Sequence, residues 1–483
     1  MKKNVILLLI IIAVFQAFAC TIGVASSEAT LTNRPMLWKS RDQNPNSTNT
    51  LRYVENMTYK FVGVATPNEN RVWMGVNEMG FALANSLAND LTVGIGEFNN
   101  GNLIYTALGL SANLTEFENY LNYLTQENTI SLELRGNFVA FDAEGNTKVY
   151  EVNNDNYWSY EPTAAEPYML RTNFSLHGGS ANGLERYIRS SEIISGLVEA
   201  NELTVNSLFT KQMRDVDDPF PSNYALPWEY GDPTPLIQTD YSICRANTVS
   251  AVVIEGVEPG QDPALSTMWV IMGNPFTSYA LPLFPTIKPN LTHFNNISLN
   301  SPDVTNLLWS GNNSYFLDTS YFVKSNGFSL LKHFQNVEND IYDEFEDMKT
   351  LLSNNQISTT EIKQFINAKS SQAYDFSSNL YLTFTPNEDV DSVPDNRITA
   401  YPNPFHETLF IKSNSSNREA AKVRIYNLKG QLVRSITNDN KINGELYWDG
   451  KDEFRREVAS GIYLISYEAG SYWASKKVIR LSN

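Results

Sequence analysis

The fold is decided by the stretch Cys20-Thr21-Ile22-Gly23-Val24-Ala25 and, shortly after it, Arg34-Pro35-Met36-Leu37-Trp38-Lys39-Ser40-Arg41-Asp42. The first stretch is rich in β-branched and small residues, which favours a strand that fixes Cys20 in a sheet. The second follows a turn and is typical of another strand, which ends in clustered basic residues and an aspartate. We expect the two strands to pair, so that this charged end lies beside Cys20.

The segment that follows alternates strand and helix patterns. Strands are expected at residues 60–65, 72–77, 81–85, 248–255 and 268–272, with a hairpin over 137–151 that turns at 144–146. Helices are expected at 114–124, 184–198, 203–213, 328–352 and 360–368. Strands paired through hairpins, with helices grouped between them, predict an α+β fold built from packed sheet layers.

Composition and charge restrict the possible functions of the 483-residue chain. This length fits two or three domains, and the content of 42% apolar and 18% charged residues is typical of a chain that buries a large core. The net charge of −17 argues against nucleic acid as the main partner, since phosphate binding needs a basic face. The four histidines and two cysteines show no metal-ligand spacing, and no phosphate-binding glycine motif is present, so we expect no metal and no cofactor.

The first 19 residues are typical of a signal peptide. Lys2 and Lys3 precede an apolar run over residues 5–19, which ends in the small-x-small cleavage site Ala17-Phe18-Ala19. Fifteen residues are too few to span a bilayer comfortably, and no later segment is a membrane-helix candidate. We therefore expect an exported mature chain that is soluble or attached to a surface by other means.

The charge of the chain changes sign near its end. Residues 20–396 carry 20 basic and 44 acidic residues, whereas residues 397–483 carry 14 basic and 9 acidic ones. The acidic, proline-containing segment 385–396 between them predicts a linker after a domain over 20–384. Short strand patterns at 408–412, 422–427, 431–436 and 461–468 predict a small all-β sandwich at 397–483.

Three interpretations fit a cysteine directly after a signal-cleavage site. Cys20 is the acylated anchor of a lipoprotein, although Ala17 stands where a lipobox usually has leucine, or it is an idle thiol. The third is an N-terminal nucleophile. The α-amine freed by cleavage has an ordinary pKa of about 7.7–8.0, so it can take the thiol proton near neutral pH. In that case Asp42 would hold the α-ammonium, and Lys39 or Arg41 would favour the thiolate.

The third interpretation is supported by a resemblance to the N-terminal-nucleophile hydrolases, in the branch of isopenicillin-N acyltransferase and carcinine hydrolase. Choloylglycine hydrolases and penicillin V acylases resemble the chain more distantly. The matching stretches are Cys20-Thr21, residues 34–42, 72–82, 141–145 (Phe-Asp-Ala-Glu-Gly), 170–174 (Leu-Arg-Thr-Asn-Phe) and 245–253. The resemblance implies a four-layer αββα sandwich. It also implies attack of Cys20 on an amide carbonyl, through an acyl-thioester, with transfer to water or an amine.

The same resemblance assigns roles to individual residues. Asp42 matches the acid that holds the α-amine, Asn173 the asparagine beside the nucleophile, and Asn85 the oxyanion donor. Arg186 stands where the distant relatives have an active-site arginine. Those relatives place arginine three residues before the aspartate, where this chain has Lys39. Its own arginine, Arg41, adjoins Asp42, so the cation that serves the thiol stays open.

Structural alternatives exist for each of these residues. Asparagines near turns commonly bond to local backbone, and an arginine on an amphipathic helix commonly faces solvent. Arg245 is a candidate for binding a substrate carboxylate, with a structural ion pair as its alternative. Cys244 is expected to be a free buried thiol, and a disulfide with Cys20 would abolish the proposed mechanism.

The tail resembles the C-terminal sorting domain of type IX secretion in Bacteroidetes-like bacteria. The matching stretches are residues 400–405 (Ala-Tyr-Pro-Asn-Pro-Phe), 423–430, 448–452 and 458–464. The resemblance implies the secretion machinery as a partner and a place outside the cell or on its surface. The alternative is a carbohydrate-binding or adhesion sandwich.

Together these patterns predict a secreted, cofactor-independent amidohydrolase or acyltransferase that acts on small N-acyl amides. A dipeptidase of the same fold, an inactive surface binding protein and a lipoprotein are the alternatives. The sequence leaves open the substrate, the choice between hydrolysis and transfer, and the oligomeric state.

Overall fold

A computed structural model of the chain gives the fold. It describes residues 20–43, 49–127, 130–216, 236–239, 242–296, 309–310, 321–384, 398–403, 405–413, 422–427, 432–437, 441–442, 445–469 and 472–481. The chain divides into two compact units, Met1–Pro386 and Asn387–Asn483. The expected signal peptide (1–19) and linker (385–396) lie outside the described residues.

An antiparallel six-stranded sheet forms the centre of the first unit, in the order β12-β1-β2-β14-β15-β16. Its strands are β1 (Cys20–Ala25), β2 (Met36–Asp42), β12 (Tyr168–Arg171), β14 (Thr248–Glu255), β15 (Thr267–Met272) and β16 (Ala280–Leu283). The two stretches quoted first are therefore adjacent central strands, as expected. Gly23 is needed at this pairing, because a Cβ there would lie 2.3 Å from the Trp38 ring.

A seven-stranded sheet packs against the first, in the order β11-β10-β9-β6-β5-β4-β3. Its strands are β3 (Thr50–Val54), β4 (Phe61–Ala65), β5 (Val72–Asn77), β6 (Ala82–Leu87), β9 (Arg135–Phe141), β10 (Thr147–Asn153) and β11 (Tyr157–Tyr160). The expected hairpin is confirmed as β9–β10, turning at Gly145 with φ +90°. Shorter strands are β7 (Phe98–Asn99), β8 (Leu132–Glu133), β13 (Leu236–Gln238), β17 (Trp309–Ser310) and β18 (Tyr321–Val323).

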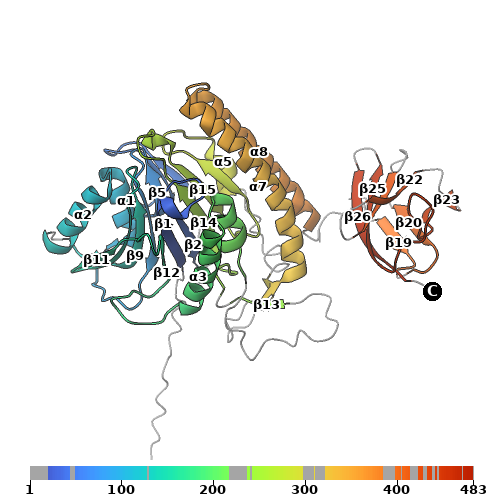
Figure 1. The fold of residues 1–483 in the computed structure, drawn as a ribbon, viewed down its shortest axis with the longest axis horizontal. Coiled ribbons are helices and arrows are strands. Elements are labelled where there is room, and N and C mark those ends of the chain that lie inside the picture. The colour runs from blue at the N-terminus through green and yellow to red at the C-terminus, as the bar shows by residue number, and fades with distance from the viewer. Residues whose placement is uncertain are drawn as a thin grey trace, which may run out of the picture. The chain divides into compact units, whose positions relative to one another are not determined.

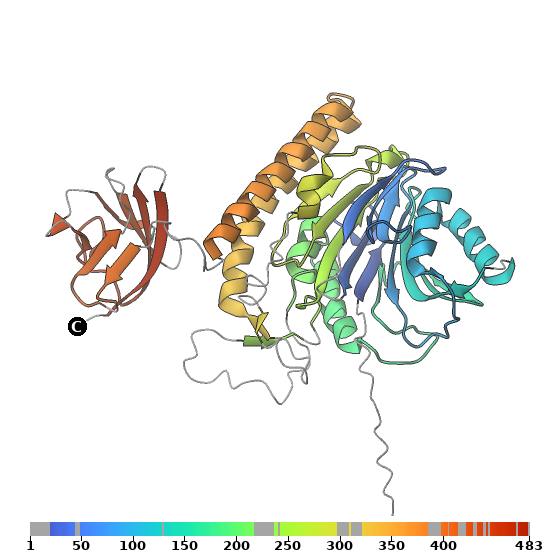
Figure 2. The same ribbon diagram turned by 180° about the vertical axis from the view of Figure 1, so that it is seen from behind.

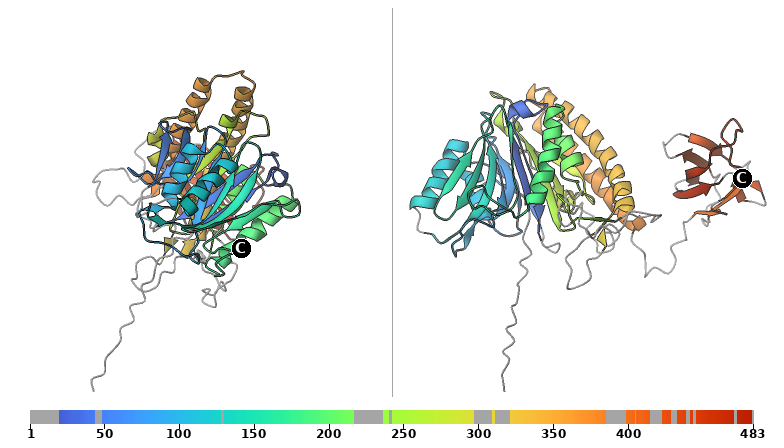
Figure 3. Two further views of the ribbon diagram at one scale, coloured as in Figure 1. Left: turned by 90° about the vertical axis from the view of Figure 1, so that its left-hand side faces the viewer. Right: turned by 60° about the horizontal axis from the view of Figure 1, so that its bottom comes forward.

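Helices cover the outer face of each sheet (Figures 1 and 2). Helices α1 (Asn100–Leu110) and α2 (Leu114–Asn122) lie on the seven-stranded sheet. The six-stranded sheet is covered by α3 (Leu184–Glu199), α4 (Val205–Ser207), α5 (Leu291–Asn296), α7 (Lys324–Ser353) and α8 (Thr359–Phe384). Figure 3 shows the resulting order of helix, sheet, sheet, helix. The predicted αββα four-layer sandwich is confirmed.

Two apolar clusters hold the layers together. One contains Val24, Leu37, Met74 and Val76 and joins the two sheets to the helices on the six-stranded sheet. The other packs α1 and α2 on the outer face of the seven-stranded sheet. Cys20 begins β1, so the charged end of the β1–β2 pair lies at one edge of the layer between the sheets.

Two expected helices were wrong in extent. Residues 360–368 form only the beginning of α8, which continues to Phe384 and packs along α7. Residues 203–213 form the short α4 followed by a π-helical turn, Leu208–Gln212. In both segments packing on the sheet, rather than local pattern, sets the length.

The second unit is a small all-β sandwich, as expected from the tail. Its strand orders are β19-β20-β24-β23 and β22-β21-β25-β26 among the described residues. The strands are β19 (Ile398–Tyr401), β20 (Leu409–Ser413), β21 (Lys422–Asn427), β22 (Leu432–Ile436), β23 (Lys441–Ile442), β24 (Glu445–Trp448), β25 (Gly461–Ala469) and β26 (Tyr472–Arg480). Ile411, Trp448, Ile425 and Ile465 form its core. No helix of the described chain has the length and apolar character needed to cross a membrane.

Candidate active site

Pairing of β1 with β2 places Cys20 directly opposite Arg41, and Ile22 opposite Lys39. Opposed residues project to the same face of a sheet, so Cys20, Lys39 and Arg41 share one face. This face is the one between the sheets, because Lys39 bonds to residues of the seven-stranded sheet. Cys20 is 7% exposed, Lys39 1% and Arg41 5%. Strand pairing thus gathers a thiol and two cations in one buried layer.

The main chain of Cys20 is held by two side chains that are distant in sequence. Its nitrogen donates to Asn173 Oδ1 at 3.0 Å, and its carbonyl oxygen accepts from Arg186 Nη1 at 2.5 Å. Arg186 also donates to Asn173 Oδ1 at 2.7 Å and to Thr21 Oγ1 at 3.1 Å. The structure therefore brings three of the predicted site residues into direct contact.

Arg186 reaches Cys20 from the first turn of α3 and is buried, so its solvent-facing alternative is not the one observed. Gly183 caps this helix with φ +79°, and a Cβ there would lie 2.3 Å from Arg186 Nη2. Burial lowers the pKa of Arg186 to about 10, and Arg245 lowers it too, while Asp42 and Cys20 raise it.

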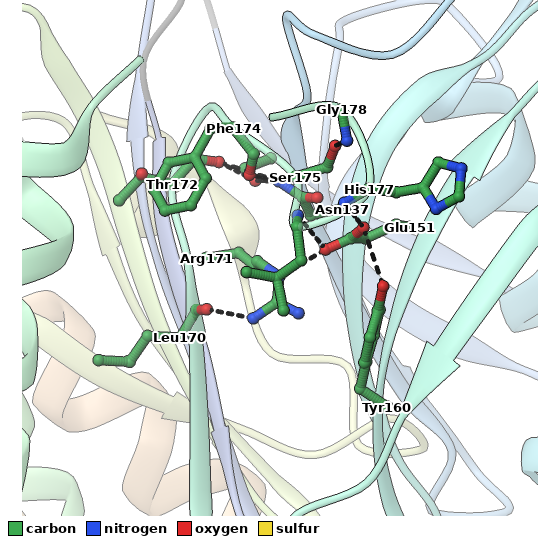
Figure 4. Close-up of polar contacts among 12 residues, drawn as sticks. Asn137, Glu151, Tyr160, Leu170, Arg171, Thr172, Phe174, Ser175, His177 and Gly178 are labelled. Atoms are coloured by element: carbon green, nitrogen blue, oxygen red, sulfur yellow. Dashed lines mark hydrogen bonds and ion pairs between the residues drawn. The ribbon is translucent and has the colours of Figure 1, made fainter. Parts of the chain in front are cut away.

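The loop after β12 carries Asn173, and buried side chains of the seven-stranded sheet hold it (Figure 4). Asn137 Nδ2 donates to the carbonyl oxygens of Thr172 at 3.2 Å and Phe174 at 3.0 Å, which flank Asn173. Glu151 accepts from two backbone nitrogens farther along the loop, at 2.8 and 3.0 Å. Asn173 is therefore fixed from both sides before it meets Cys20.

The Lys39 ammonium lies where the β5–β6 ladder stops. Its Nζ donates to Trp73 O and to Asn85 Oδ1, both at 2.9 Å. Trp73 and Asn85 each lie one residue beyond the paired part of their strand. Burial lowers the pKa of Lys39 from 10.5 to about 7, whereas Cys20 raises it and Arg41 lowers it. This cation therefore titrates near neutral pH and interacts electrostatically with the thiol.

Lys39 also orients the Asn85 carboxamide. An ammonium only donates, so it takes the oxygen side of the amide and leaves the Nδ2 side for other acceptors. Asn85 Nδ2 has no hydrogen-bond acceptor among the described residues. It is also not among the fully buried polar atoms that lack a partner. Asn85 thus presents an unused N–H donor to accessible space.

Arg41 is the residue opposite Cys20 in the β1–β2 ladder. Its Nη1 donates to Asn49 Oδ1, and its guanidinium lies 4.8 Å from the centre of the Trp73 ring. Burial lowers the pKa of Arg41 to about 10, while Cys20 raises it. Both candidate cations therefore interact electrostatically with the Cys20 thiol. One is the Lys39 ammonium between the sheets, and the other is the Arg41 guanidinium beside the Trp73 ring.

Asp42 projects from β2 to the opposite face from Arg41. Its carboxylate accepts from Thr248 Oγ1 at 2.6 Å, from Arg245 Nε at 3.0 Å and from Arg245 Nη2. Arg245 thus forms the structural ion pair that was its alternative role. Cys244 is a free buried thiol, and so is Cys20. Burial raises the pKa of Cys244, and Asp42 raises it further.

Several residues around the site were missed by sequence reasoning. Asn49 and Trp73 hold Arg41, while Asn137 and Glu151 hold the Asn173 loop. The sequence signal was a polar residue inside a strand pattern, as with Asn137 in β9 and Glu151 in β10. That signal does not say which distant segment the side chain bonds to.

The assembled groups are suited to nucleophilic and acid–base chemistry. A thiol, the nitrogen of the same residue, an N–H donor and three cations converge, and such groups supply attack, proton transfer and oxyanion stabilisation. Within the part of the chain that the structure describes, no three His, Cys, Asp or Glu side chains are placed to hold a metal ion.

Comparison with known proteins gave results for each unit. The first unit is similar to a Caenorhabditis elegans N-acylethanolamine-hydrolyzing acid amidase ortholog, at 14% identity and TM-score 0.30, covering 49% of this chain and 92% of that one. It is also similar to conjugated bile acid hydrolase from Clostridium perfringens, at 10% identity and TM-score 0.33, covering 56% and 94%. A second variant of that hydrolase gave 9%, 0.32, 55% and 92%. A comparison with curated proteins found no match.

Residues 399–480 match the family described as "Secretion system C-terminal sorting domain". These residues span the β-sandwich from β19 to β26. The second unit is therefore a type IX sorting domain, as the tail motifs implied, and it directs the protein to the cell surface or the exterior. The machinery that reads this domain is a partner of the protein.

Proposed function

We propose that the first unit is an N-terminal-nucleophile amidohydrolase or acyltransferase that acts on small N-acyl amides through Cys20. The observation that carries the proposal is the environment of Cys20. Its nitrogen bonds to Asn173, its carbonyl to Arg186, and its thiol lies on the face that holds Lys39 and Arg41. A merely structural cysteine needs none of these contacts.

The proposed reaction begins once cleavage before Cys20 frees its α-amine. The amine donates one hydrogen bond to Asn173 Oδ1 and uses its lone pair to take the thiol proton. The thiolate then attacks the substrate carbonyl, and the carbonyl electron pair moves to oxygen. The ammonium returns its proton to the amide nitrogen as the C–N bond breaks, which leaves an acyl-thioester and a free amine. Asn173 Oδ1 holds the ammonium, whereas Asp42, which the resemblance assigns to this role, is bonded to Arg245 and Thr248.

Asn85 and Lys39 serve the developing oxyanion in this proposal. The Asn85 Nδ2 group faces accessible space because Lys39 holds its oxygen. An oxyanion donor of this kind lowers the barrier by about 3–4 kcal/mol. Water, activated by the same α-amine, then adds to the thioester and restores the thiol. An amine acceptor in place of water would make the enzyme an acyltransferase.

The test uses the mature full-length chain and a panel of N-acyl amides. Cys20→Ser should abolish turnover, and Cys244→Ser, the matched control, should retain it because that thiol lies apart from the proposed steps. Mass spectrometry should find a chain that starts at Cys20 with a free amine and one rapidly alkylated thiol. Unchanged turnover in Cys20→Ser would refute the proposal, and a lipidated Cys20 would favour the lipoprotein alternative.

A further inference from the structure

The sorting domain displays one aromatic side chain prominently to solvent. Phe454 is 78% exposed, the largest exposed fraction among the large apolar side chains described in this unit. It lies in the turn between β24 and β25 that Lys451 and Glu457 close with an isolated β-bridge. A single exposed apolar residue is ordinary on a protein surface, so its meaning depends on how this 451–457 turn presents it.

Asp452 closes the 451–457 turn from inside. Its Oδ1 accepts from the backbone nitrogens of Phe454 and Arg456, both at 2.9 Å, and its own nitrogen donates to Arg456 O at 2.9 Å. Its Oδ2 accepts from Arg456 Nε at 2.8 Å. The hydrogen bond from the Arg456 backbone is the main reason that the pKa of Asp452 lies below its ordinary value. The backbone on both sides of Phe454 is therefore fixed.

The turn is also tied to the body of the domain. Glu453 N donates to Val433 O at 2.9 Å, and Glu453 Oε1 accepts from Ser435 N at 2.6 Å, so the turn bonds to β22. Trp448 Nε1, in the core, donates to Lys451 O at 2.9 Å. The exposed ring thus has a rigid support, and a group held in this way loses little conformational freedom when a partner binds it.

The backbone conformation of Arg455 is costly for an arginine. Its φ is +61°, in the left-handed region that glycine and asparagine adopt most readily. The other non-glycine residues with positive φ among the described residues are all asparagines: Asn33, Asn68, Asn201 and Asn355. Glycine would relieve the strain at this position, so the strain indicates that the arginine side chain itself is used.

The guanidinium of Arg455 forms no hydrogen bond or ion pair with the described residues. The other cations of the turn are paired, Lys451 with Glu457 and Arg456 with Asp452. The turn therefore offers an exposed aromatic ring and, on the next residue, a planar cation that is free to bind. Aromatic and arginine side chains are the ones that most often dominate binding between proteins.

We propose that the 451–457 turn docks on a protein of the secretion machinery, with Phe454 entering an apolar pocket and Arg455 bonding to a carboxylate at the rim of that pocket. The machinery is the expected partner because the turn lies within residues 399–480, the matched sorting domain. A guanidinium matches a carboxylate in the bidentate manner, which would fix the orientation of the domain on its partner. This interaction is independent of the chemistry at Cys20.

The experiment follows export of the full chain in a bacterium that has type IX secretion, as the fraction of the protein found outside the cell. Phe454→Ser should lower this fraction at least about tenfold, the usual effect of truncating an aromatic hot spot. Arg455→Gly should lower it severalfold, although glycine relaxes the turn and should leave the unfolding temperature unchanged or raised. Arg455→Lys, which keeps the charge, should restore part of the export.

Ile95→Ser is the matched control, because Ile95 is 100% exposed but lies in the first unit, and it should be exported like wild type. Wild-type export of Phe454→Ser would overturn the proposal. So would wild-type export of Arg455→Gly, because the arginine side chain would then have no part in recognition. If Phe454→Ser loses thermal stability as well as export, Arg455→Gly decides, since reduced export of a chain that unfolds at or above the wild-type temperature reports lost recognition.

Discussion

The first unit buries two kinds of cation, and their partners differ. Cations away from Cys20 face buried carboxylates, in the pairs Arg171–Glu151, Arg214–Glu338 and Lys349–Glu255, with distances of 2.9, 2.7 and 2.9 Å. Cations around Cys20 face neutral oxygens instead, in the contacts of Lys39, Arg41 and Arg186 with Asn85, Asn49 and Asn173.

This difference distinguishes structural charge from functional charge. A buried ion pair satisfies both partners inside the fold and leaves nothing for a ligand. A cation held by an asparagine oxygen keeps its full charge, and that charge is available to a thiolate, an oxyanion or a carboxylate. Burying these cations without a carboxylate partner costs free energy, and this cost indicates that the site binds an anionic group.

Removing the anion of a structural pair should be the most damaging change to stability. Glu338→Ala leaves the Arg214 guanidinium buried and unpaired, so the free energy of unfolding should fall by about 3–5 kcal/mol. Denaturant unfolding measures this. Glu344→Ala on the same helix breaks only the exposed pair with Lys369 and should cost at most about 1 kcal/mol. Equal losses for the two variants would contradict the distinction.

Removing a neutral partner at the site should affect catalysis instead. Asn85→Ala deletes the proposed oxyanion donor, so kcat should fall about 10²–10³-fold. The control is Asn77→Ala, which removes a buried asparagine that bonds to Leu108 O and Ser111 O on the outer face of the same sheet. It should lower stability and leave kcat of the folded protein unchanged. A kcat within threefold of wild type for Asn85→Ala would remove Asn85 from the mechanism.

Replacing an unpaired cation should stabilise the fold and do so in a pH-dependent way. Burial holds the pKa of Lys39 at about 7. The unfolded chain therefore binds more protons than the folded one between pH 7 and about 10.5, and wild-type stability rises with pH over that window. Lys39→Met should be more stable than wild type below pH 7, by on the order of 2 kcal/mol after its lost hydrogen bonds, and this gain should fade toward pH 10.

Unfolding curves at pH 6, 8 and 10 measure the effect of Lys39→Met. The exposed Lys211, paired with Glu202, supplies the control variant Lys211→Met, whose small effect should not change over this range. A difference in the free energy of unfolding between Lys39→Met and wild type that stays constant across the three pH values would show that burial does not lower the pKa of Lys39. Catalytic turnover should fall in Lys39→Met, because Asn85 loses its orientation.

The parts of the site predicted from sequence were those encoded by local pattern. The β1 and β2 patterns, joined by a turn, were sufficient to place Arg41 opposite Cys20 and Lys39 on the same face, whereas Asp42 projects to the other face and bonds to Arg245. The prediction of Asn173 and Arg186 came from the family resemblance, since nothing local to them indicates that they meet Cys20. The roles of Asn49, Trp73, Asn137 and Glu151 could not be predicted, because each bonds across the gap between distant segments.

The sequence by itself determined the layer-forming elements, the location of the cysteine at the start of a strand and the secretion tail, because periodicity and short motifs act over neighbouring residues. The tertiary structure decided which cations are neutralised and which are not. Arg245 and Arg41 are both arginines close to Asp42 in the fold, yet only Arg245 shares its face and forms the ion pair. Alternation of side chains across β2 turns Arg41 to the other face, where it is left with Cys20.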